Sequence, residues 1–80
     1  MTQNRIRHEL QSIWIAVLGV PQVGGTDDFF DLGGDSLAAA RMTSLAQSAD
    51  IPLRAMDVLK NPRFADLVTA VEGKVVDAPR

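Results

Sequence analysis

The chain has 80 residues, 46% of them hydrophobic, and its 8 basic and 10 acidic side chains give a net charge of −2. This length suits one domain, and the hydrophobic share favours a buried core over disorder. The near balance of charge excludes the basic stripe of a nucleic-acid-binding protein, and no apolar run reaches the roughly 20 residues that a bilayer requires. The N-terminal segment also lacks the apolar region of a signal peptide. We therefore expect a cytoplasmic, monomeric protein that binds neither nucleic acid nor membrane.

The chain contains no cysteine and a single histidine, His8. The lack of cysteine excludes disulfides, thiolate metal sites and thiol redox chemistry. His8 has no second ligand residue beside it, so we expect no metal site and place this imidazole on a solvated helix face. Stability must then come from packing.

Two long helices are predicted in the first fifty residues. A second helix is expected from Ser36 to Ala49, with Asp35 or Ser36 at its N-cap. The first is expected between Arg5 and Gly19, where apolar residues recur at steps of three and four, which is typical of one buried helix face. The apolar residues of the two helices are Ile6, Leu10, Ile13, Trp14, Val17 and Leu18, then Ala39, Met42, Leu45, Ala46 and Ala49.

A short helix and a longer last helix complete the expected fold. The short helix runs from about Arg54 to Lys60, and Asn61 and Pro62 then offer an N-cap and a first helical position. The last helix ends at Gly73, and its buried face consists of Phe64, Leu67, Val68 and Val71.

The elements together predict an all-α, four-helix bundle with three longer helices, a short third helix and a long loop between the first two. We expect one domain over residues 1–80, folded from about 5 to 72, with a tail or linker over 73–80. The predicted core includes Leu10, Ile13, Trp14, Val17, Phe30, Met42, Leu59, Leu67 and Val68.

Residues 20–35, VPQVGGTDDFFDLGGD, form the long loop, because two Gly-Gly pairs, a proline and four aspartates leave no helical period. Loops of this length in compact domains are usually functional. Phe29, Phe30 and Leu32 are too apolar to remain in water, so at least one phenylalanine should pin the loop to the core.

Ser36 follows Gly33, Gly34 and Asp35. Two interpretations of this serine involve no covalent modification by another enzyme. Ser36 could serve only as a helix cap, with the glycines allowing the loop to turn. It could also be a hydrolase nucleophile, because Gly-Asp-Ser-Leu is the signature of an esterase and lipase family. A serine nucleophile needs a base within hydrogen-bond reach, however, and no histidine lies downstream of Ser36.

A third interpretation makes Ser36 a modification site. A helix N-terminus favours an attached phosphate, and preceding glycines leave the hydroxyl open to a modifying enzyme. The exposed apolar side chain of Leu37 offers that enzyme a contact. A basic partner would be steered by the nearby carboxylates of Asp27, Asp28, Asp31 and Asp35.

The segment DFFDLGGDSL, residues 28–37, resembles the core motif of peptidyl carrier domains, whose usual form is D-x-F-F-x-L-G-G-x-S-L. The resemblance extends over residues 5–72, through Trp14 and the stretches 17–20, 51–53, 57–62 and 64–67. Asp35 stands where many members have histidine, which leaves the cargo open.

This resemblance implies that a phosphopantetheinyl transferase attaches phosphopantetheine from coenzyme A to the Ser36 hydroxyl, flanked by Gly33, Gly34, Asp35 and Leu37. The arm would carry an aminoacyl, aryl or peptidyl group as a thioester in nonribosomal peptide synthesis. The domain would not be an enzyme; its partners would be an adenylation domain and condensation, tailoring or thioesterase enzymes.

Two alternatives have the same helices but other roles. One is an acyl carrier of polyketide or fatty-acid synthesis, whose second helix is usually more acidic than LAAARMTSLAQSA, which has no acid. The other is a plain helical interaction module. The candidate docking residues for partners lie on the polar side of the second helix and on the short helix: Leu37, Ala40, Arg41, Ser44 and Met56.

Overall fold

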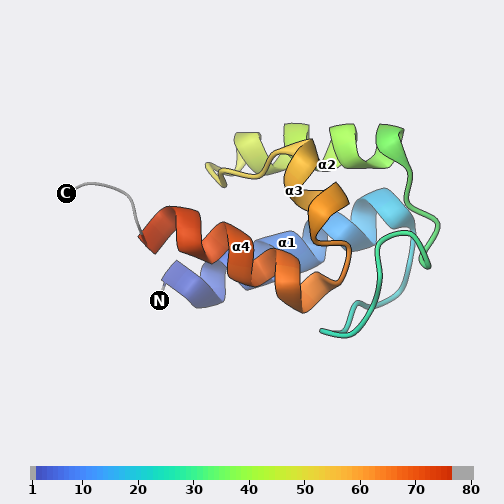
Figure 1. Ribbon diagram of the computed structural model, residues 1–80, viewed down its shortest axis with the longest axis horizontal. Helices are drawn as coiled ribbons and strands as arrows, with labels where there is room; N and C mark the ends of the chain where they lie inside the picture. Colours follow the sequence, from blue (N-terminus) through green and yellow to red (C-terminus); the bar gives the residue numbers. More distant parts are fainter. Residues whose placement is uncertain (1, 77–80) are drawn as a thin grey trace.

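The computed structural model describes residues 2–76 and forms an all-α bundle (Figure 1). Its helices are α1 (Thr2–Leu18), α2 (Ser36–Ser48), α3 (Ala55–Lys60) and α4 (Phe64–Val76). No strand occurs within residues 2–76, where Asp28 and Arg63 form an isolated antiparallel bridge. The predicted architecture, with a short third helix and a long first connection, is therefore confirmed.

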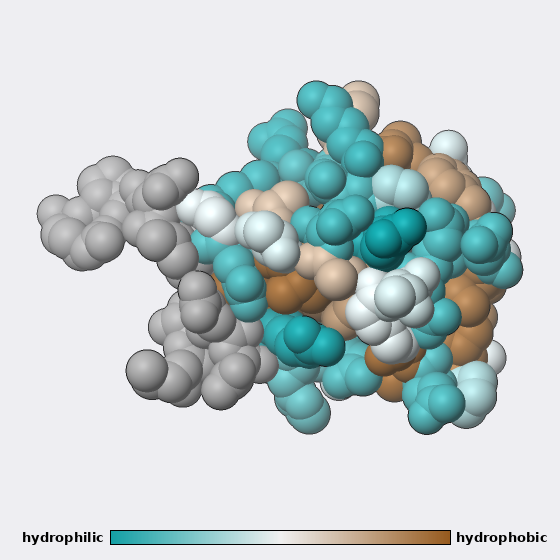
Figure 2. Space-filling model, turned by 60° about the horizontal axis from the view of Figure 1, so that its bottom comes forward, coloured by the Kyte–Doolittle hydropathy of each residue, from teal (hydrophilic) through white to brown (hydrophobic). Residues whose placement is uncertain are grey.

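The helices enclose one core. α1 packs against both α2 and α4, and α3 contacts α2 and α4 (Figure 1). The loop between α1 and α2 gathers at one end of the bundle, where α2 and α4 begin. At this end, hydrophobic atoms reach the surface among hydrophilic ones (Figure 2). Across residues 2–76, no helix combines the length and the apolarity needed to cross a membrane.

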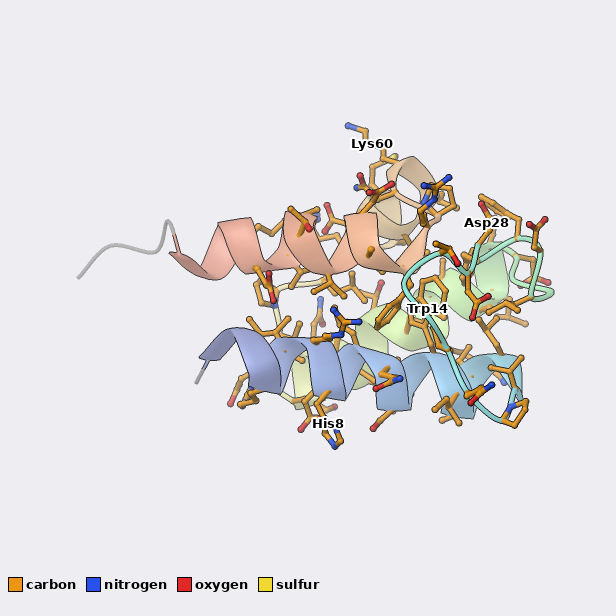
Figure 3. All side chains as sticks on the ribbon, turned by 90° about the horizontal axis from the view of Figure 1, so that it is seen from below. His8, Trp14, Asp28 and Lys60 are labelled. Carbon is orange, nitrogen blue, oxygen red and sulfur yellow. The ribbon has the colours of Figure 1, made fainter. Side chains whose placement is uncertain are left out.

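Trp14 is the largest fully buried side chain, and it joins α1 to two other parts of the fold. Its ring meets those of Phe29 and Phe64 edge to face, with centroid separations of 5.9 and 5.0 Å. Such aromatic pairs add about 0.5–1.5 kcal/mol each beyond the burial of their area. Trp14 points into the bundle, whereas His8 points away from it (Figure 3). The rest of the core consists of Ile6, Leu10, Ile13, Val23, Ala39, Met42, Ala46, Ile51, Leu53, Val58, Leu67, Val68 and Val71.

The loop phenylalanine in the core is Phe29 and not Phe30, so this part of the predicted core is wrong. Phe29 is fully buried, while Phe30 is 48% exposed. The backbone N–H of Phe29 donates to the Pro62 carbonyl at 2.7 Å, which ties this residue to the segment before α4. Phe30 lies over Phe29 from outside, at a ring-centroid separation of 5.2 Å.

Two leucines predicted to be buried are also exposed. Leu59 is 38% exposed because Val58, its neighbour in α3, is the residue of this helix that enters the core. A helix of six residues has fewer than two turns, so few of its side chains can face the core. Leu45 is 44% exposed because it lies at the margin between α1 and α2. Val17 is half-buried and packs against the core.

α4 begins at Phe64, and the predicted start at Asn61 and Pro62 is wrong. The first amides of α4 are satisfied by the long loop: Phe64 N–H donates to the Asp27 carbonyl and Ala65 N–H to the Gly25 carbonyl, both at 2.9 Å. A helix start needs such acceptors, and here distant backbone supplies them in place of a local side chain.

Gly73 does not end the last helix, because α4 continues through it to Val76. Gly73 therefore lies inside α4, and the predicted C-cap is wrong. Of the expected tail over 73–80, residues 77–80 lie outside the described residues. The limits of the folded domain, about 5 to 72, stay a prediction.

The start of α3 is tied to the end of α4 by a partly buried ion pair. The Asp57 carboxylate accepts hydrogen bonds from Lys74 Nζ and from Arg54 N–H, the latter at 2.9 Å. Lys74 Nζ also donates to the Pro52 carbonyl at 3.1 Å. Burial raises the pKa of Asp57, but these hydrogen bonds and the nearby positive charges outweigh it and hold the pKa below its ordinary 3.8. Asp57 is therefore ionised at neutral pH, and the pair fixes α3 against α4.

Candidate modification site at the start of α2

Ser36 is the first residue of α2, and its side chain is exposed. The cap of this helix is made by Asp35, whose backbone is extended (φ −146°, ψ −172°) and whose Oδ1 accepts from Ala38 N–H at 2.9 Å. Of the two predicted caps, Asp35 and Ser36, the N-cap is therefore Asp35. This assignment also removes the basis for treating Ser36 as a cap and nothing more. The hydroxyl stands in the first turn of a helix, where the helix dipole favours an attached anion.

The two glycines before Asp35 have different tasks. Gly33 has φ +95°, a conformation that side chains other than glycine rarely adopt. Gly34 has an ordinary φ, but a Cβ on it would lie 2.5 Å from Cζ of Phe29. The backbone of Gly34 thus runs directly over the buried ring, and its N–H donates to the Phe29 carbonyl at 2.9 Å. Together, Gly33 and Gly34 allow the backbone to pass over the core and reach Ser36.

Two aspartates of the acidic run hold the loop in shape. Asp28 Oδ1 accepts from the backbone N–H of Phe30 at 2.8 Å and of Asp31 at 3.2 Å, and Asp27 Oδ2 accepts from Gly24 N–H at 2.7 Å. Aspartate commonly stabilises turns by this local bonding. Sequence reasoning assigned these carboxylates only to the steering of partners, although the Asp-x-x pattern could have indicated the turns. Asp28 lies at this end of the molecule (Figure 3).

The distance between Ser36 and His8 excludes the hydrolase interpretation. Ser36 begins α2 beside the last turn of α1, because Leu18 and Leu37 line one cavity. His8 lies ten residues before Leu18, which is about 15 Å along a helix. A serine nucleophile requires its base within hydrogen-bond reach, so His8 cannot activate Ser36.

The candidate docking residues all lie on the surface of α2 and α3. Leu37 is 66% exposed, and Met56 on α3 is 56% exposed. The other three, Ala40, Arg41 and Ser44, are also exposed on α2. A leucine that covered the Gly-Gly loop would be mostly buried, so the exposure of Leu37 favours contact with a partner.

Comparison with known proteins gives the family. The family described as "phosphopantetheine attachment site" matches residues 8–71. The FR901469 synthetase of Dothideomycetidae sp. (strain 11243) is 42% identical over 74 residues. These residues make up 90% of this chain but, to the nearest percent, 0% of the synthetase. The nonribosomal peptide synthetase inpB of Emericella nidulans is 42% identical over 71 residues, 86% of this chain and 3% of that protein. The chain therefore spans only a small fraction of the curated relatives that it matches.

Solved structures of similar fold are carrier proteins. A structure described as a nonribosomal PCP domain is 38% identical, with a TM-score of 0.72 and coverage of 79% of this chain and 82% of that one. BlmI, a type-II acyl carrier protein of Streptomyces verticillus involved in bleomycin biosynthesis, is 25% identical, with a TM-score of 0.80 and coverage of 92% and 90%. The chain belongs to the phosphopantetheine-attachment family, as a carrier domain of the kind found in nonribosomal peptide synthetases.

Carrier domains of this family bind phosphopantetheine covalently and are not themselves catalytic. The exposed hydroxyl at the start of α2 and the glycines before it fit such an attachment, because they leave a nucleophilic oxygen open to solvent. The arm would supply a flexible thiol on which a thioester can form, and this chain would supply a rigid base for that arm.

Proposed function

We propose that Ser36 is the attachment site of the phosphopantetheine arm in this carrier domain. The Ser36 oxygen would bond to the phosphorus that bears the pantetheine of coenzyme A, with loss of the hydroxyl proton. The diphosphate bond would break at the same phosphorus, and the adenosine nucleotide would leave. The observation that carries this proposal is the placement of the hydroxyl: it is exposed, in the first turn of α2, beside a cap that Asp35 already provides.

Replacing Ser36 should abolish the modification. We expect the wild-type chain, incubated with coenzyme A, magnesium and a broad-specificity phosphopantetheinyl transferase, to gain the mass of one arm by intact-protein mass spectrometry. Ser36→Ala should gain none. Ser48→Ala, which removes an exposed serine of α2 outside the candidate docking residues, is the matched control and should be labelled like wild type. Labelling of Ser36→Ala to the wild-type extent would refute the assignment.

The holo domain would carry an aminoacyl, aryl or peptidyl thioester in nonribosomal peptide synthesis. An adenylation domain would load it, and condensation, tailoring or thioesterase enzymes would use the cargo. The absence of acidic residues in α2 supports these partners over those of an acyl carrier in polyketide or fatty-acid synthesis. Attachment of the arm depends on coenzyme A, and loading depends on an activated acid, which supports a cytoplasmic location.

The contact surface for these enzymes would consist of Leu37, Ala40, Arg41 and Ser44 on α2 and Met56 on α3. All five are exposed, and none of them contributes to the core. Small interfaces of this kind suit partners that must bind briefly and leave.

Leu37→Ala tests this surface. Because Leu37 is exposed, the free energy of unfolding of the variant should lie within about 0.5 kcal/mol of the wild-type value. Its initial rate of arm transfer should fall several-fold, as measured by timed mass spectra at limiting transferase. Leu59→Ala, a similar truncation of an exposed leucine on α3, is the control. A stable Leu37→Ala protein that is modified at the wild-type rate would remove Leu37 from the surface.

A further inference from the structure

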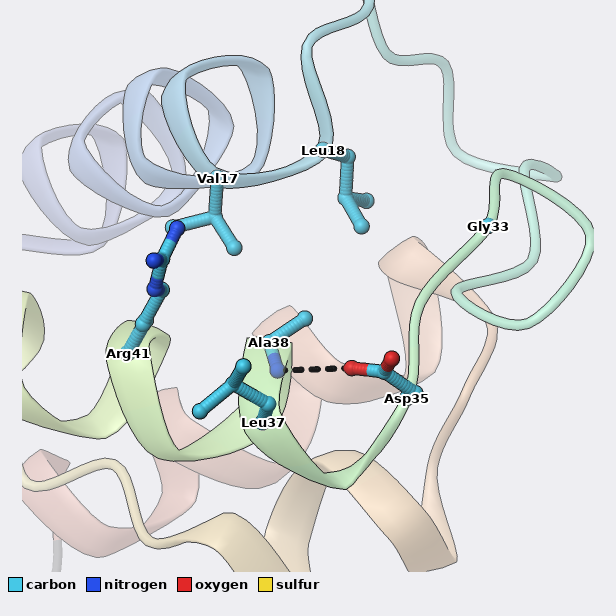
Figure 4. Close-up of a pocket in the computed structure, with 7 residues that line it drawn as sticks. All are labelled: Val17, Leu18, Gly33, Asp35, Leu37, Ala38 and Arg41. Carbon is cyan, nitrogen blue, oxygen red and sulfur yellow. Dashed lines mark hydrogen bonds between the residues drawn. The ribbon is translucent and has the colours of Figure 1, made fainter.

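A groove runs between α1 and α2 on the flank of α2 that faces α1. It consists of two adjoining cavities of about 240 and 320 Å³, which share Val17 and Arg41 in their linings. We call this the α1–α2 groove and define it by Ala16 and Val17 of α1 with Leu37, Arg41 and Leu45 of α2. Arg41 extends toward Val17 and crosses the groove (Figure 4).

Apolar side chains line the groove on both sides of Arg41, and the carboxylate of Asp35 lines its end next to Gly33. Leu37 and Leu45 stand one helical turn before and after Arg41, and they are 66% and 44% exposed. The two leucines are thus about 12 Å apart along the axis of α2. Two large exposed apolar side chains in line, next to hollows, indicate a surface that a partner covers.

Arg41 determines which partner can cover this surface. Within residues 5–74, Arg41 makes no ion pair; the pair found there joins Lys74 and Asp57. Covering the groove would remove water from the guanidinium, which costs free energy unless a carboxylate replaces the water. The occupant must therefore present an acid at its centre and apolar side chains one turn to either side.

We propose that the α1–α2 groove binds an amphipathic helix of a partner protein, with Asp or Glu at its centre and large apolar residues three or four positions before and after it. A helix laid into a groove presents side chains at this spacing on one face. This inference deepens the proposed function, because it rests on the docking role assigned to Leu37 and Arg41 and names the chemistry of the partner.

The occupant would leave the Ser36 hydroxyl accessible. Ser36 and Arg41 are five residues apart in α2, which places them about 140° apart around the helix. Ser36 is absent from the lining of both cavities. The partner that supplies this helix could therefore act on Ser36 or its arm while the helix is bound.

A second copy of the chain is a poorer occupant. In a two-fold dimer centred on the groove, the same patch of each copy would face the other. Arg41 would then lie against its own counterpart, and like charges in a covered interface repel.

The test is a titration of the uniformly ¹⁵N-labelled chain with a synthetic helical peptide, followed by NMR. The probe is an Ala- and Gln-rich 17-residue peptide with leucine at its fifth and thirteenth positions and glutamate at its ninth. We expect shift changes centred on Val17, Arg41 and Leu45. Arg41→Glu should weaken binding about tenfold, and a peptide with lysine at its ninth position should restore binding to this variant. Leu45→Ala should also weaken binding, whereas Leu59→Ala should not. Melting curves would verify that each variant is folded.

Several results would overturn the groove proposal. These are no shift changes at millimolar peptide, shift changes centred elsewhere, equal binding by wild type and Arg41→Glu, or a concentration-dependent dimer in sedimentation that buries the groove. Arm transfer to Ser36 is measured in parallel. Failure of peptide binding with normal arm transfer would refute the groove alone, and peptide binding without arm transfer would refute the function of Ser36 alone.

Discussion

Phe29→Ala should lower the free energy of unfolding by about 3–5 kcal/mol. Phe29 is fully buried and contacts the ring of Trp14, so its truncation leaves a cavity between α1, the loop and α4. This cost is a large share of the ~5–15 kcal/mol that stabilises a domain. Urea unfolding followed by circular dichroism at 222 nm measures it, and the fluorescence of Trp14 gives a second probe at the lesion.

Phe30→Ala is the matched control for this change. The side chain is 48% exposed and makes one edge-to-face contact with Phe29. Its loss should cost no more than about 1 kcal/mol. Equal costs for the two variants, or a larger cost for Phe30→Ala, would show that the loop docks with the other ring inward.

Gly34→Ala should destabilise the domain by about 1–3 kcal/mol, the range for overpacking a filled core. The added methyl group would lie 2.5 Å from Phe29, so either the ring or the loop must move. Because Gly34 is two residues before Ser36, a moved loop should also slow arm transfer. Thermal melting and timed mass spectra measure the two effects.

Gly24→Ala controls for the loss of a loop glycine as such. A Cβ at Gly24 would have as its nearest neighbour an oxygen of Asp27 at 3.8 Å, an ordinary contact. We expect a change within about 0.5 kcal/mol and normal arm transfer. If Gly34→Ala behaves like Gly24→Ala, the close approach to Phe29 does not constrain the site.

The helices could be predicted from sequence because their apolar spacing is regular. Trp14, Met42 and Leu67 lie in the core as the periodicity of each helix indicates. Phe29 and Phe30 could not be distinguished, because they are adjacent, equally apolar and in a loop without a period. What separates them is a hydrogen bond to the Pro62 carbonyl, more than thirty residues away.

The candidate site, too, could be predicted only in part. The positions of Ser36, Gly33 and Gly34 could be chosen from their order in the sequence and from the family resemblance. Their separate tasks could not, because the φ of Gly33 and the approach of Gly34 to Phe29 depend on how the loop crosses the core. The helix start predicted at Asn61 failed for a related reason, since local cap signals do not reveal acceptors supplied from elsewhere in the chain.

The bonds from Phe64 and Ala65 to the carbonyls of Asp27 and Gly25 have a consequence for folding. Residues 25 and 65 are forty positions apart, so the first turn of α4 is completed only after a non-local closure of the chain. The long loop and the start of α4 therefore belong to one cooperative unit, which opens and closes as a whole. A segment without regular secondary structure can thus be as slow to exchange its bonded amides as the helix that it caps, and the end of the domain that carries Ser36 gains rigidity from it.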